Sequence, residues 1–324
     1  DANISNSNSI TSSFIDNYNI IWTASDCNLN YLEPGKGNLW ISRSICDVNE
    51  TTISPTDIII KNNTIFLGTN NQGIHLINYT FGSAGLVFTN SNKEYHFNIS
   101  NYLSSNHVSD LEYVNGILYI SNMNAGMDRY DILSSTWLNS WSSNNWLSSN
   151  QIHGTAHTSE WLYIFTGSTV QTYNTNSMIF SSTIYLSDMG LDDYGHSINS
   201  WPNNNLPRSP DYDTILIGDS SGKLVTIVGE DIVGEIILAT SPESDDDAQI
   251  TAFIEDGEQG EIWISGSHII DRFDKKDKLW KEIIDLQDLL NNNGGTEPAF
   301  NINEIKTILQ DSNDRIWIGT NSGL

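Results

Sequence analysis

Four aspartates in one stretch of the chain have the residue type and spacing needed to bind a metal ion or to act as a catalytic acid and base. They are Asp192, Asp193, Asp211 and Asp213. They lie in residues 187–213, a segment that also holds three prolines and Trp201. Carboxylate oxygens on loops are ligands that Ca²⁺ prefers, and a pair of carboxylates suffices for acid–base cleavage of a glycosidic bond. The stretch therefore supports a calcium site or a glycan-active lyase or hydrolase, against the simpler interpretation of a solvated acidic loop.

Histidine and arginine patterns argue against two other kinds of site. His153 and His157 stand four residues apart in a strand-like segment, which separates them by about 13 Å at strand rise, too far for one metal ion. The sequence has no CxxC, HExxH or EF-hand pattern. Asp311–Trp317 is similar to the Asp-box of sialidases, S-x-D-x-G-x-x-W, but Asp314-Arg315 lacks the glycine. The chain has only five arginines, which makes the arginine triad of a sialidase implausible. We assign no catalytic residue, expect no required cofactor, and favour a binding module over an enzyme.

The two cysteines, Cys27 and Cys46, flank the predicted hairpin turn Glu33–Asn38. A register centred on that turn places them opposite each other, or nearly so, on adjacent strands. We predict a disulfide, which fits an oxidising, extracellular or cell-surface setting. The alternative is two unpaired structural thiols. Sequons for N-glycosylation, which such a setting permits, stand at Asn3, Asn49, Asn62, Asn78 and Asn98.

The charge of the chain excludes two classes of partner. The 324 residues carry 14 Lys+Arg against 40 Asp+Glu, a formal net charge of −26. Nucleic acids and anionic lipid surfaces both need clustered cations. No apolar run approaches the roughly 18 residues that span a bilayer, so we expect no membrane insertion within this chain. The acidity itself suits either a salty medium or calcium binding.

Seven copies of a strand–turn unit run along the chain. Aligned on one position, they are centred on Ile21, Phe66, Tyr119, Tyr163, Leu216, Trp263 and Trp317. Successive spacings are 45, 53, 44, 53, 47 and 54 residues. A period of about 40–50 residues made of short strands is typical of β-propeller blades. We expect the aligned side chains to be buried between neighbouring blades.

Each copy predicts four strands joined by turns, and hence an all-β fold. We predict a single domain, a seven-bladed β-propeller of four-stranded antiparallel blades. The blades are expected at residues 8–50, 51–100, 101–145, 146–186, 211–247, 248–285 and 303–324, with insertions at 187–210 and 286–302. The seventh blade is incomplete, so we expect the natural chain to continue after residue 324. Closure of the ring should place the first and seventh copies side by side, with Ile10–Phe14 near Ile305–Leu309.

Recurring motifs give the unit a family resemblance. They are Leu103-Ser104-Ser105-Asn106, Tyr130-Asp131 and Trp137, and Ile316-Trp317-Ile318-Gly319-Thr320 with Gly323-Leu324. In this pattern the chain resembles the two-component-regulator propeller repeat, although the copy around Leu216 lacks a clear Tyr-Asp pair. The resemblance implies an extracytoplasmic sensing domain or surface-protein module joined to further domains of the same polypeptide.

Short polar side chains recur in the turns between the second and third strands. The candidates for ligand binding are Asp26, Asn71, Asn124, Asp219, His268 and Asn321, with Trp201 from the long loop. In a propeller these turns and the loops between blades emerge on one face, which suits a polar ligand such as a glycan or peptide, or a protein partner. Ordinary turn chemistry selects the same residue types. A further alternative is a structural unit of a surface layer or appendage.

Overall fold

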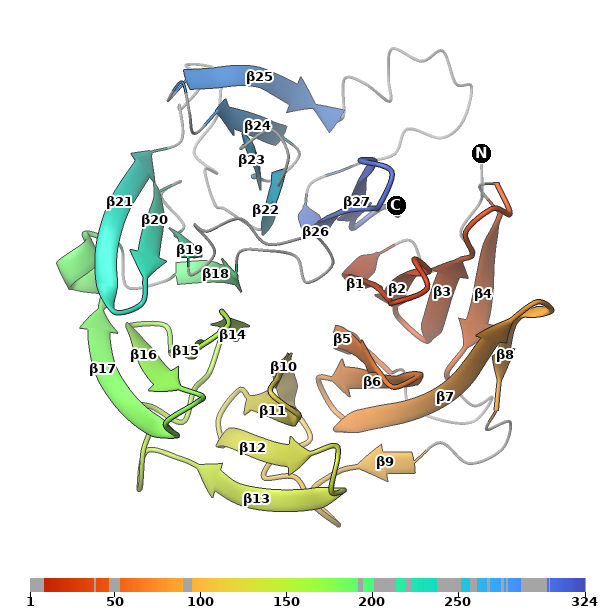
Figure 1. Ribbon diagram of the computed structural model, residues 1–324, viewed down its shortest axis with the longest axis horizontal. Coiled ribbons are helices and arrows are strands. Elements are labelled where there is room, and N and C mark those ends of the chain that lie inside the picture. Colours follow the sequence, from red (N-terminus) through yellow and green to blue (C-terminus); the bar gives the residue numbers. More distant parts are fainter. Residues whose placement is uncertain are drawn as a thin grey trace. The chain divides into compact units, whose positions relative to one another are not determined.

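In the residues that it describes, the computed structural model of the chain consists mainly of short antiparallel strands and turns (Figure 1). It describes residues 9–37, 39–46, 53–89, 95–191, 195–200, 214–219, 223–237, 252–256, 261–266, 269–274, 277, 279–286, 302 and 304–323. Two compact units divide it: residues 1–153 with 311–319 and 323–324, and residues 154–310 with 320–322. Within the described residues no helix is long and apolar enough to cross a membrane.

Three sheets of the first unit follow the sequence order of their strands. The first contains β1 (Ile10–Ile15), β2 (Ile21–Ser25), β3 (Asn28–Leu32) and β4 (Trp40–Ser44). The second contains β5 (Pro55–Lys61), β6 (Thr64–Thr69), β7 (Ile74–Gly82), β8 (Gly85–Phe88) and β9 (Tyr95–Phe97). The third contains β10 (Val108–Val114), β11 (Ile117–Asn122), β12 (Gly126–Asp131) and β13 (Thr136–Trp141). Neighbouring strands pair antiparallel, as the repeat predicts.

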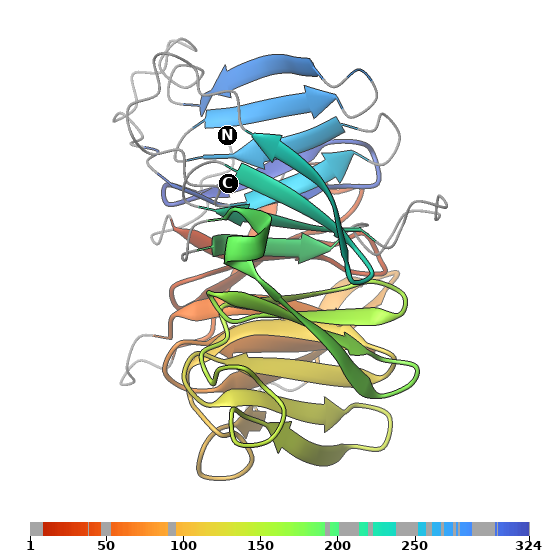
Figure 2. The ribbon, with the colours of Figure 1, turned by 90° about the vertical axis from the view of Figure 1, so that its left-hand side faces the viewer.

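Three four-stranded sheets with the same order form the second unit. The first contains β14 (Gly154–His157), β15 (Trp161–Phe165), β16 (Thr169–Asn174) and β17 (Ile179–Tyr185), followed by the 3₁₀ turn η1 (Leu186–Met189) (Figure 2). The next contains β18 (Gly195–Ser200), β19 (Thr214–Asp219), β20 (Lys223–Val228) and β21 (Asp231–Ile237). The last contains β22 (Ala252–Asp256), β23 (Glu261–Ser265), β24 (Ile269–Asp274) and β25 (Leu279–Asp285). The boundary between the units then falls at the hairpin of β26 (Ile305–Gln310) and β27 (Ile316–Thr320).

The period-2 alternation of the strands explains why the sheets stack. In β6, Ile65 and Leu67 pack into a core shared with the first sheet, while Phe66 between them packs into a core shared with the third. In β19, Ile215 and Ile217 likewise face one core and Leu216 faces the next. Because successive side chains point to opposite faces of a strand, each inner strand needs a neighbour on both sides. This two-sided burial is the packing of propeller blades.

The first copy of the repeat is aligned one residue too early in the sequence prediction. Asp16 accepts hydrogen bonds from the backbone of Tyr18 and Ile20, and from Nε1 of Trp22 at 3.0 Å. Asp311 has the same partners, namely the backbone of Asn313 and Arg315 and Nε1 of Trp317 at 2.9 Å. The equivalent of Trp317 is therefore Trp22, which is fully buried, and not Ile21.

Burial of the other aligned positions is confirmed for four of six. Phe66, Tyr119, Tyr163 and Leu216 are buried. Trp263 and Trp317 are only half-buried, so the expectation was wrong for these two. In both cases an arginine covers the ring, with the guanidinium carbon 4.7 Å from the Trp263 centroid for Arg272 and 5.2 Å from the Trp317 centroid for Arg315.

The structure differs from the predicted blades in two places, where it has strands that the sequence pattern did not predict. β18 lies inside the expected insertion 187–210 and is the first strand of its sheet, so that blade begins before residue 211. Its sequence, GHSINS, has a single large apolar residue and no alternation to detect. The second departure is an extra hairpin. β7 pairs first with β9 and then, beyond Asn78, with β8, so β9 is the strand that completes the blade.

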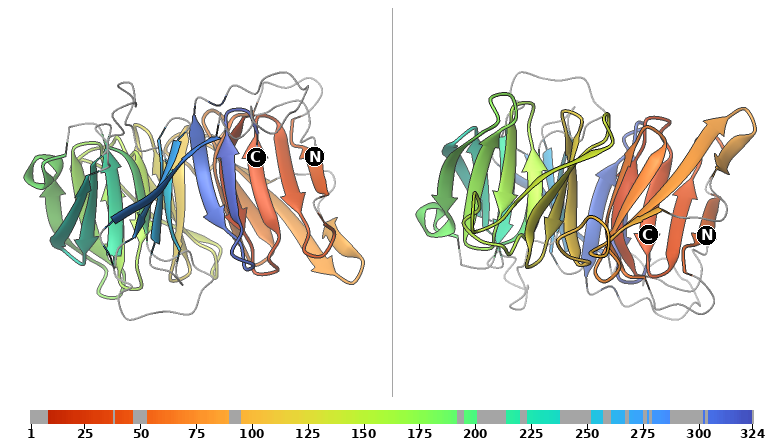
Figure 3. Two further views of the ribbon diagram at one scale, coloured as in Figure 1. Left: turned by 90° about the horizontal axis from the view of Figure 1, so that it is seen from above. Right: turned by 90° about the horizontal axis from the view of Figure 1, so that it is seen from below.

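The extra hairpin covers the first sheet with aromatic side chains. Tyr79 lies 5.1 Å from Trp22 between ring centroids, and Phe88 lies 5.9 Å from Tyr31. The guanidinium of Arg43, on β4, stacks over Phe88 at 4.2 Å. Figure 3 shows the orange hairpin reaching past the red strands of the first sheet. The 53-residue spacing from Phe66 to Tyr119 follows from this addition.

Candidate functional site

One edge of the first three sheets is built from two kinds of loop that are bonded to each other. The backbone N–H of Cys27 donates to the carbonyl of Ile53 at 3.1 Å. Gly73 donates in the same way to Asn106, and Gly126 to Asn150, both at 2.9 Å. Cys27 and Gly73 lie in the turn between the second and third strands, and Gly126 begins the third strand directly after that turn. Each acceptor lies in the loop that leads to the next sheet. The turns and the connecting loops therefore share one edge, as predicted.

The donor in each pair has a left-handed backbone. The φ angles are 56° at Cys27, 79° at Gly73 and 81° at Gly126. A Cβ on Gly73 would lie 2.0 Å from the carbonyl oxygen of Phe97, and one on Gly126 would lie 2.1 Å from that of Trp141. Only glycine fits at these two positions, because both the φ angle and the close approach exclude a side chain. The loop edge is therefore fixed by its backbone in the second and third sheets.

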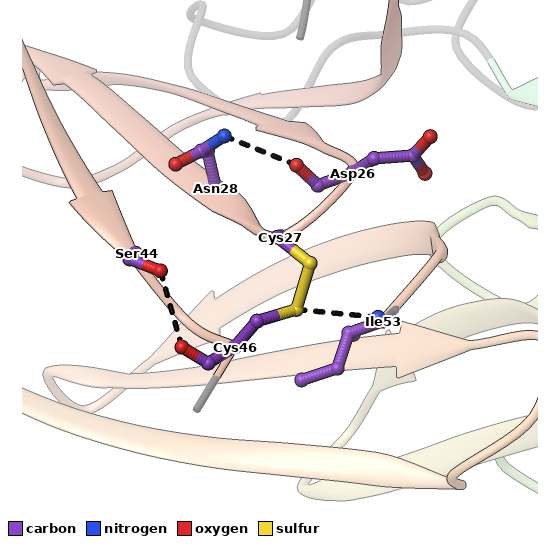
Figure 4. The surroundings of a disulfide bond; sticks show 6 residues. All are labelled: Asp26, Cys27, Asn28, Ser44, Cys46 and Ile53. Atoms are coloured by element: carbon purple, nitrogen blue, oxygen red, sulfur yellow. Dashed lines mark hydrogen bonds between the residues drawn. A yellow bond between two sulfur atoms is a disulfide. The ribbon is translucent and has the colours of Figure 1, made fainter. Parts of the chain in front are cut away.

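In the first sheet Cys27 stands at the position of that glycine, and a disulfide holds it in place (Figure 4). Cys27 and Cys46 are bonded, with their Cα atoms 4.9 Å apart, which confirms the predicted bridge. The backbone N–H of Ile53 donates to Sγ of Cys46 at 3.3 Å. The bridge ties the turn between β2 and β3 to the start of the connecting loop, so all three turns are held at the same edge.

Three of the residues predicted to bind ligand lie exposed in these turns. They are Asp26, Asn71 and Asn124. In the second unit Asn321 is half-buried and exchanges two hydrogen bonds with the backbone of Glu304. Asp219 ends β19 but its side chain is not described, and His268 and Trp201 lie outside the described residues. The structure thus places part of the predicted set on one edge and leaves the rest untested.

Other predicted sites fall largely outside the described residues. This holds for the four candidate calcium ligands, Asp192, Asp193, Asp211 and Asp213, and for the sequons at Asn3 and Asn49. Among the described sequons, Asn62 is exposed in the turn between β5 and β6, Asn78 accepts a hydrogen bond from Thr64 at 2.7 Å, and Asn98 opens a connecting loop. Across the described residues, no group of three or more His, Cys, Asp or Glu side chains could hold a metal ion.

Two connecting loops on this edge are structural copies of each other. They span residues 98–107, between the second and third sheets, and 142–151, after the third sheet. In the first, the Asn101 side chain accepts from the N–H of Asn98 at 2.7 Å and donates to the carbonyl of His96 at 2.8 Å. In the second, Asn145 accepts from Ser142 at 2.7 Å and donates to Ser140 at 3.1 Å.

A second asparagine repeats the match. The side chain of Asn106 accepts from the N–H of Ile99 at 2.9 Å, and that of Asn150 accepts from Ser143 at 2.7 Å. The carbonyl of the first loop residue, Asn98 or Ser142, also accepts three backbone N–H groups in each copy. Loops held by so many internal bonds have defined shapes and can position the side chains they expose.

Each copy exposes one aromatic side chain at the same position. Tyr102 is 56% exposed and Trp146 is 60% exposed, while the leucine that follows each is buried. The two lie 44 residues apart, within the repeat period. The sequence prediction missed them because it read only the Leu-Ser-Ser-Asn that follows. An aromatic directly before that motif in both copies was the available signal.

The loop at residues 98–107 is also hydrogen-bonded to a buried carboxylate of the third sheet. Asp128, on β12, is fully buried and accepts from the N–H and hydroxyl of Ser104 at 2.7 and 2.6 Å. It also accepts from Ser140 at 2.6 Å and from Asn122 at 3.1 Å. Ser104, the first serine of the Leu-Ser-Ser-Asn motif, therefore attaches its loop to the sheet.

Comparisons with known proteins agree with this architecture. Residues 299–322 match the family model of the two component regulator propeller, so the chain carries this repeat at its C-terminal end. No curated protein matches the sequence. Two similar solved structures are extracellular domains of putative hybrid two component systems from B. thetaiotaomicron, BT3049 and BT4673. They are 16% and 17% identical, with TM-scores of 0.63 and 0.65 over 98% and 99% of this chain.

A third structure shows the same fold in a different context. The WD40 beta propeller domain of Doa1 is 12% identical, with a TM-score of 0.64, over 98% of this chain and 91% of that one. At such identities the similarity shows the fold alone. The chain is an all-β propeller. It spans 39% and 38% of the two B. thetaiotaomicron chains, which extend well beyond the matched part.

Proposed function

We propose that this chain is the recognition module of an extracellular or cell-surface protein, a seven-bladed β-propeller whose loop edge binds a polar ligand. The observation that carries the proposal is the fixed loop edge, where Asp26, Asn71 and Asn124 are exposed on turns whose backbones are pinned. A binding site gains affinity when its groups are ordered before the ligand arrives. Turns held by a disulfide and by obligatory glycines meet that condition.

Three further observations support the proposed setting and the proposed wider protein. A disulfide persists in oxidising compartments. The propeller repeat at residues 299–322 is the two component regulator type. The two solved B. thetaiotaomicron structures are named as extracellular domains of hybrid two component systems. We therefore place this module in a sensor or surface protein whose further domains belong to the same polypeptide.

The proposed number of seven blades is supported by the count of described sheets. The strands form seven antiparallel sheets within the described residues, the last with two strands, β26 and β27. Completion of the last sheet by other strands would give seven four-stranded blades, as the repeat count requires.

Removal of the exposed turn residues tests the proposal. A panel of soluble oligosaccharides and peptides is screened by calorimetry against the chain and against the triple variant Asp26→Ala, Asn71→Ala, Asn124→Ala. The control is Asn176→Ala, exposed in the turn between β16 and β17. We expect a ligand whose binding is weakened by the triple variant and not by the control. Binding that survives the triple variant unchanged would place the recognition surface elsewhere and overturn the proposal.

A further inference from the structure

Two of the connecting loops on the loop edge differ from the rest of this acidic chain in carrying no charged side chain. Residues 98–107 and 142–153 contain no Asp, Glu, Lys or Arg, and neither do the turns at 70–73 and 123–126. The whole chain carries 40 acidic side chains. The exposed groups here are amides and hydroxyls, with Ser100, Asn101, Ser143 and Asn144 exposed around the two aromatics. A surface of this kind attracts neither cations nor anions, and it can donate and accept hydrogen bonds equally.

The Tyr102 ring is held in a fixed orientation. It lies parallel to Trp137, on β13, with an interplanar angle of 9° and ring centroids 5.3 Å apart. Trp137 is in turn packed edge-on against Phe97 at 4.9 Å. Tyr102 also meets Phe97 edge to face at 5.7 Å, and it keeps 56% of its surface exposed to solvent. A supported flat ring loses little freedom when something stacks on it.

The second aromatic lies at the same position in the next connecting loop. Trp146 occupies the position of Tyr102 in a loop with the same internal hydrogen bonds, and it is exposed to a similar degree. Both loops are bonded to the preceding turn through an asparagine carbonyl. Two exposed aromatic groups at equivalent positions of matching loops present the same chemistry twice.

We infer that Tyr102 and Trp146 are two equivalent stacking subsites for a neutral glycan with repeating sugar units. The inference rests on the proposed function and names its ligand and contact residues. A sugar ring has a face of C–H groups that packs on an aromatic ring, and hydroxyls that need the surrounding amides. Net-neutral polymers meet no repulsion from the uncharged loops. A repeating ligand can engage both loops, and the second contact then forms at high effective concentration.

Affinity as a function of glycan length tests the inference. Neutral oligosaccharides of increasing length are titrated against the chain, Tyr102→Ala, Trp146→Ala and the double variant. We expect the affinity of the intact chain to rise with length and each single variant to lose about tenfold for long glycans. The double variant should lose the length dependence altogether. Tyr102→Phe and Trp146→Phe keep a ring and should retain most of the binding.

The control variant is Leu133→Ala, because Leu133 is 77% exposed in the turn between β12 and β13, away from the connecting loops. Thermal melts of all variants check folding, since Tyr102 packs on Trp137. Glycan binding that the ring-removing variants leave intact would overturn the inference. So would the absence of glycan binding together with binding of a peptide or of neutral lipid vesicles.

The two proposals fail in different ways. If a peptide binds and the Asp26, Asn71, Asn124 triple variant weakens it, the proposed function stands and the glycan subsites are wrong. If glycan binds through Tyr102 and Trp146 but the triple variant has no effect, the subsites stand and the turn residues are not part of the ligand contact.

Discussion

The indole ring of Trp40 meets that of Trp317 edge to face, with centroids 5.7 Å apart and an interplanar angle of 81°. Trp40 begins β4, the outermost strand of the first sheet, and Trp317 lies on β27, the last described strand. Both belong to the first compact unit. The contact brings β4 of the first copy together with the part of the seventh copy that lies in the same unit. The finer prediction for Ile10–Phe14 and Ile305–Leu309 spans the two units and stays a prediction.

This contact should stabilise the fold by coupling the two ends of the chain. In a double-mutant cycle, Trp40→Ala and Trp317→Ala should show an interaction energy of about 0.5–1.5 kcal/mol in chemical denaturation. Pairing Trp40→Ala with Leu133→Ala is the control and should be additive, since Leu133 lies on the third sheet. Additivity of Trp40→Ala and Trp317→Ala would mean that the two rings do not interact in solution.

The repeat and the disulfide could be predicted from sequence because each depends on local pattern. Residues such as Ile65, Phe66 and Leu67 alternate between two cores, and this alternation can be predicted from consecutive residues of one strand. Cys27 and Cys46 are brought together by the register of one hairpin. Neither prediction required knowledge of distant contacts.

The features that were missed depend on contacts between elements. Trp22 is identified as the equivalent of Trp317 only by the carboxylate that each indole reaches, because Ile21 is an equally good apolar match. The β7–β8 hairpin is recognised by its packing on Trp22 and Tyr31, which no spacing reveals. β18 is a polar strand whose pairing with β19 defines it. The sequence places Tyr102 and Trp146 at the same repeat position, and the matching hydrogen bonds of their loops establish that the two sites are equivalent.

Asp16 is the most heavily bonded carboxylate of the first sheet, and its loss should be costly. Besides Trp22 and two backbone groups, it accepts the hydroxyl of Tyr79 at 2.5 Å. Burial, together with this hydrogen bond and the charge of Asp16, holds the pKa of Tyr79 above its usual value. Asp16→Ala leaves buried donors without an acceptor, so we expect a loss of about 3 kcal/mol or more in denaturant melts.

Tyr79→Phe removes only one of these bonds and should cost about 1 kcal/mol. The exposed variant Asp26→Ala is the control and should stay within about 0.5 kcal/mol of the parent chain. If Asp16→Ala were as mild as Asp26→Ala, the carboxylate would not anchor the Trp22 indole.

The glycine at the loop edge should be irreplaceable for steric reasons beyond its φ angle. Gly126→Ala would place Cβ 2.1 Å from the carbonyl oxygen of Trp141. Gly35 has a similar φ of 77° but no atom within 4 Å of an added Cβ. Gly35→Ala should therefore cost only the left-handed strain of about 1 kcal/mol, and Gly126→Ala should cost clearly more, as measured by urea denaturation. Equal costs would show that the loop edge relaxes around the new side chain.

The disulfide should contribute to stability through the loop it closes. Cys27 and Cys46 are separated by 19 residues, for which the chain-entropy relation gives about 3 kcal/mol. The double variant Cys27→Ser, Cys46→Ser should unfold at a lower urea concentration than the parent chain. Reducing agent should lower the midpoint of the parent chain and leave that of the double variant unchanged. A reductant effect of the same size on both would have a cause other than this bridge.

Asp57 links the innermost strands of three sheets. It accepts hydrogen bonds from the hydroxyl of Ser12 on β1 at 2.8 Å and from its neighbour Ile58 on β5 at 2.8 Å. It also accepts from the N–H of Leu111 on β10 at 3.0 Å. Burial outweighs these bonds and, with the nearby charge of Glu112, raises the pKa of Asp57 to about 6 from 3.8. The carboxyl therefore holds its proton more tightly in the folded chain than in the unfolded one.

The pH dependence of stability follows from the direction of that shift. Because the folded pKa lies above the unfolded one, protonation favours the folded state, and the contribution of Asp57 to stability grows as pH falls from about 6 to about 4. Asp311 acts in the opposite sense. Burial alone would raise its pKa, but hydrogen bonds from Trp317 and Arg315 outweigh burial and lower it, so its contribution is lost at low pH.

Comparison of the chain with Asp57→Asn isolates the first effect. The variant cannot take up the proton, so the difference in unfolding free energy between the two proteins should shift in favour of the parent chain as pH falls from 7 to 4. Ser12→Ala, which removes the hydroxyl but keeps the carboxyl, should retain the parent's pH profile in shape. A constant difference between the parent chain and Asp57→Asn across this range would mean that Asp57 titrates alike in the folded and unfolded states. The link between the three inner strands would then rest on hydrogen bonding to an ordinary carboxylate.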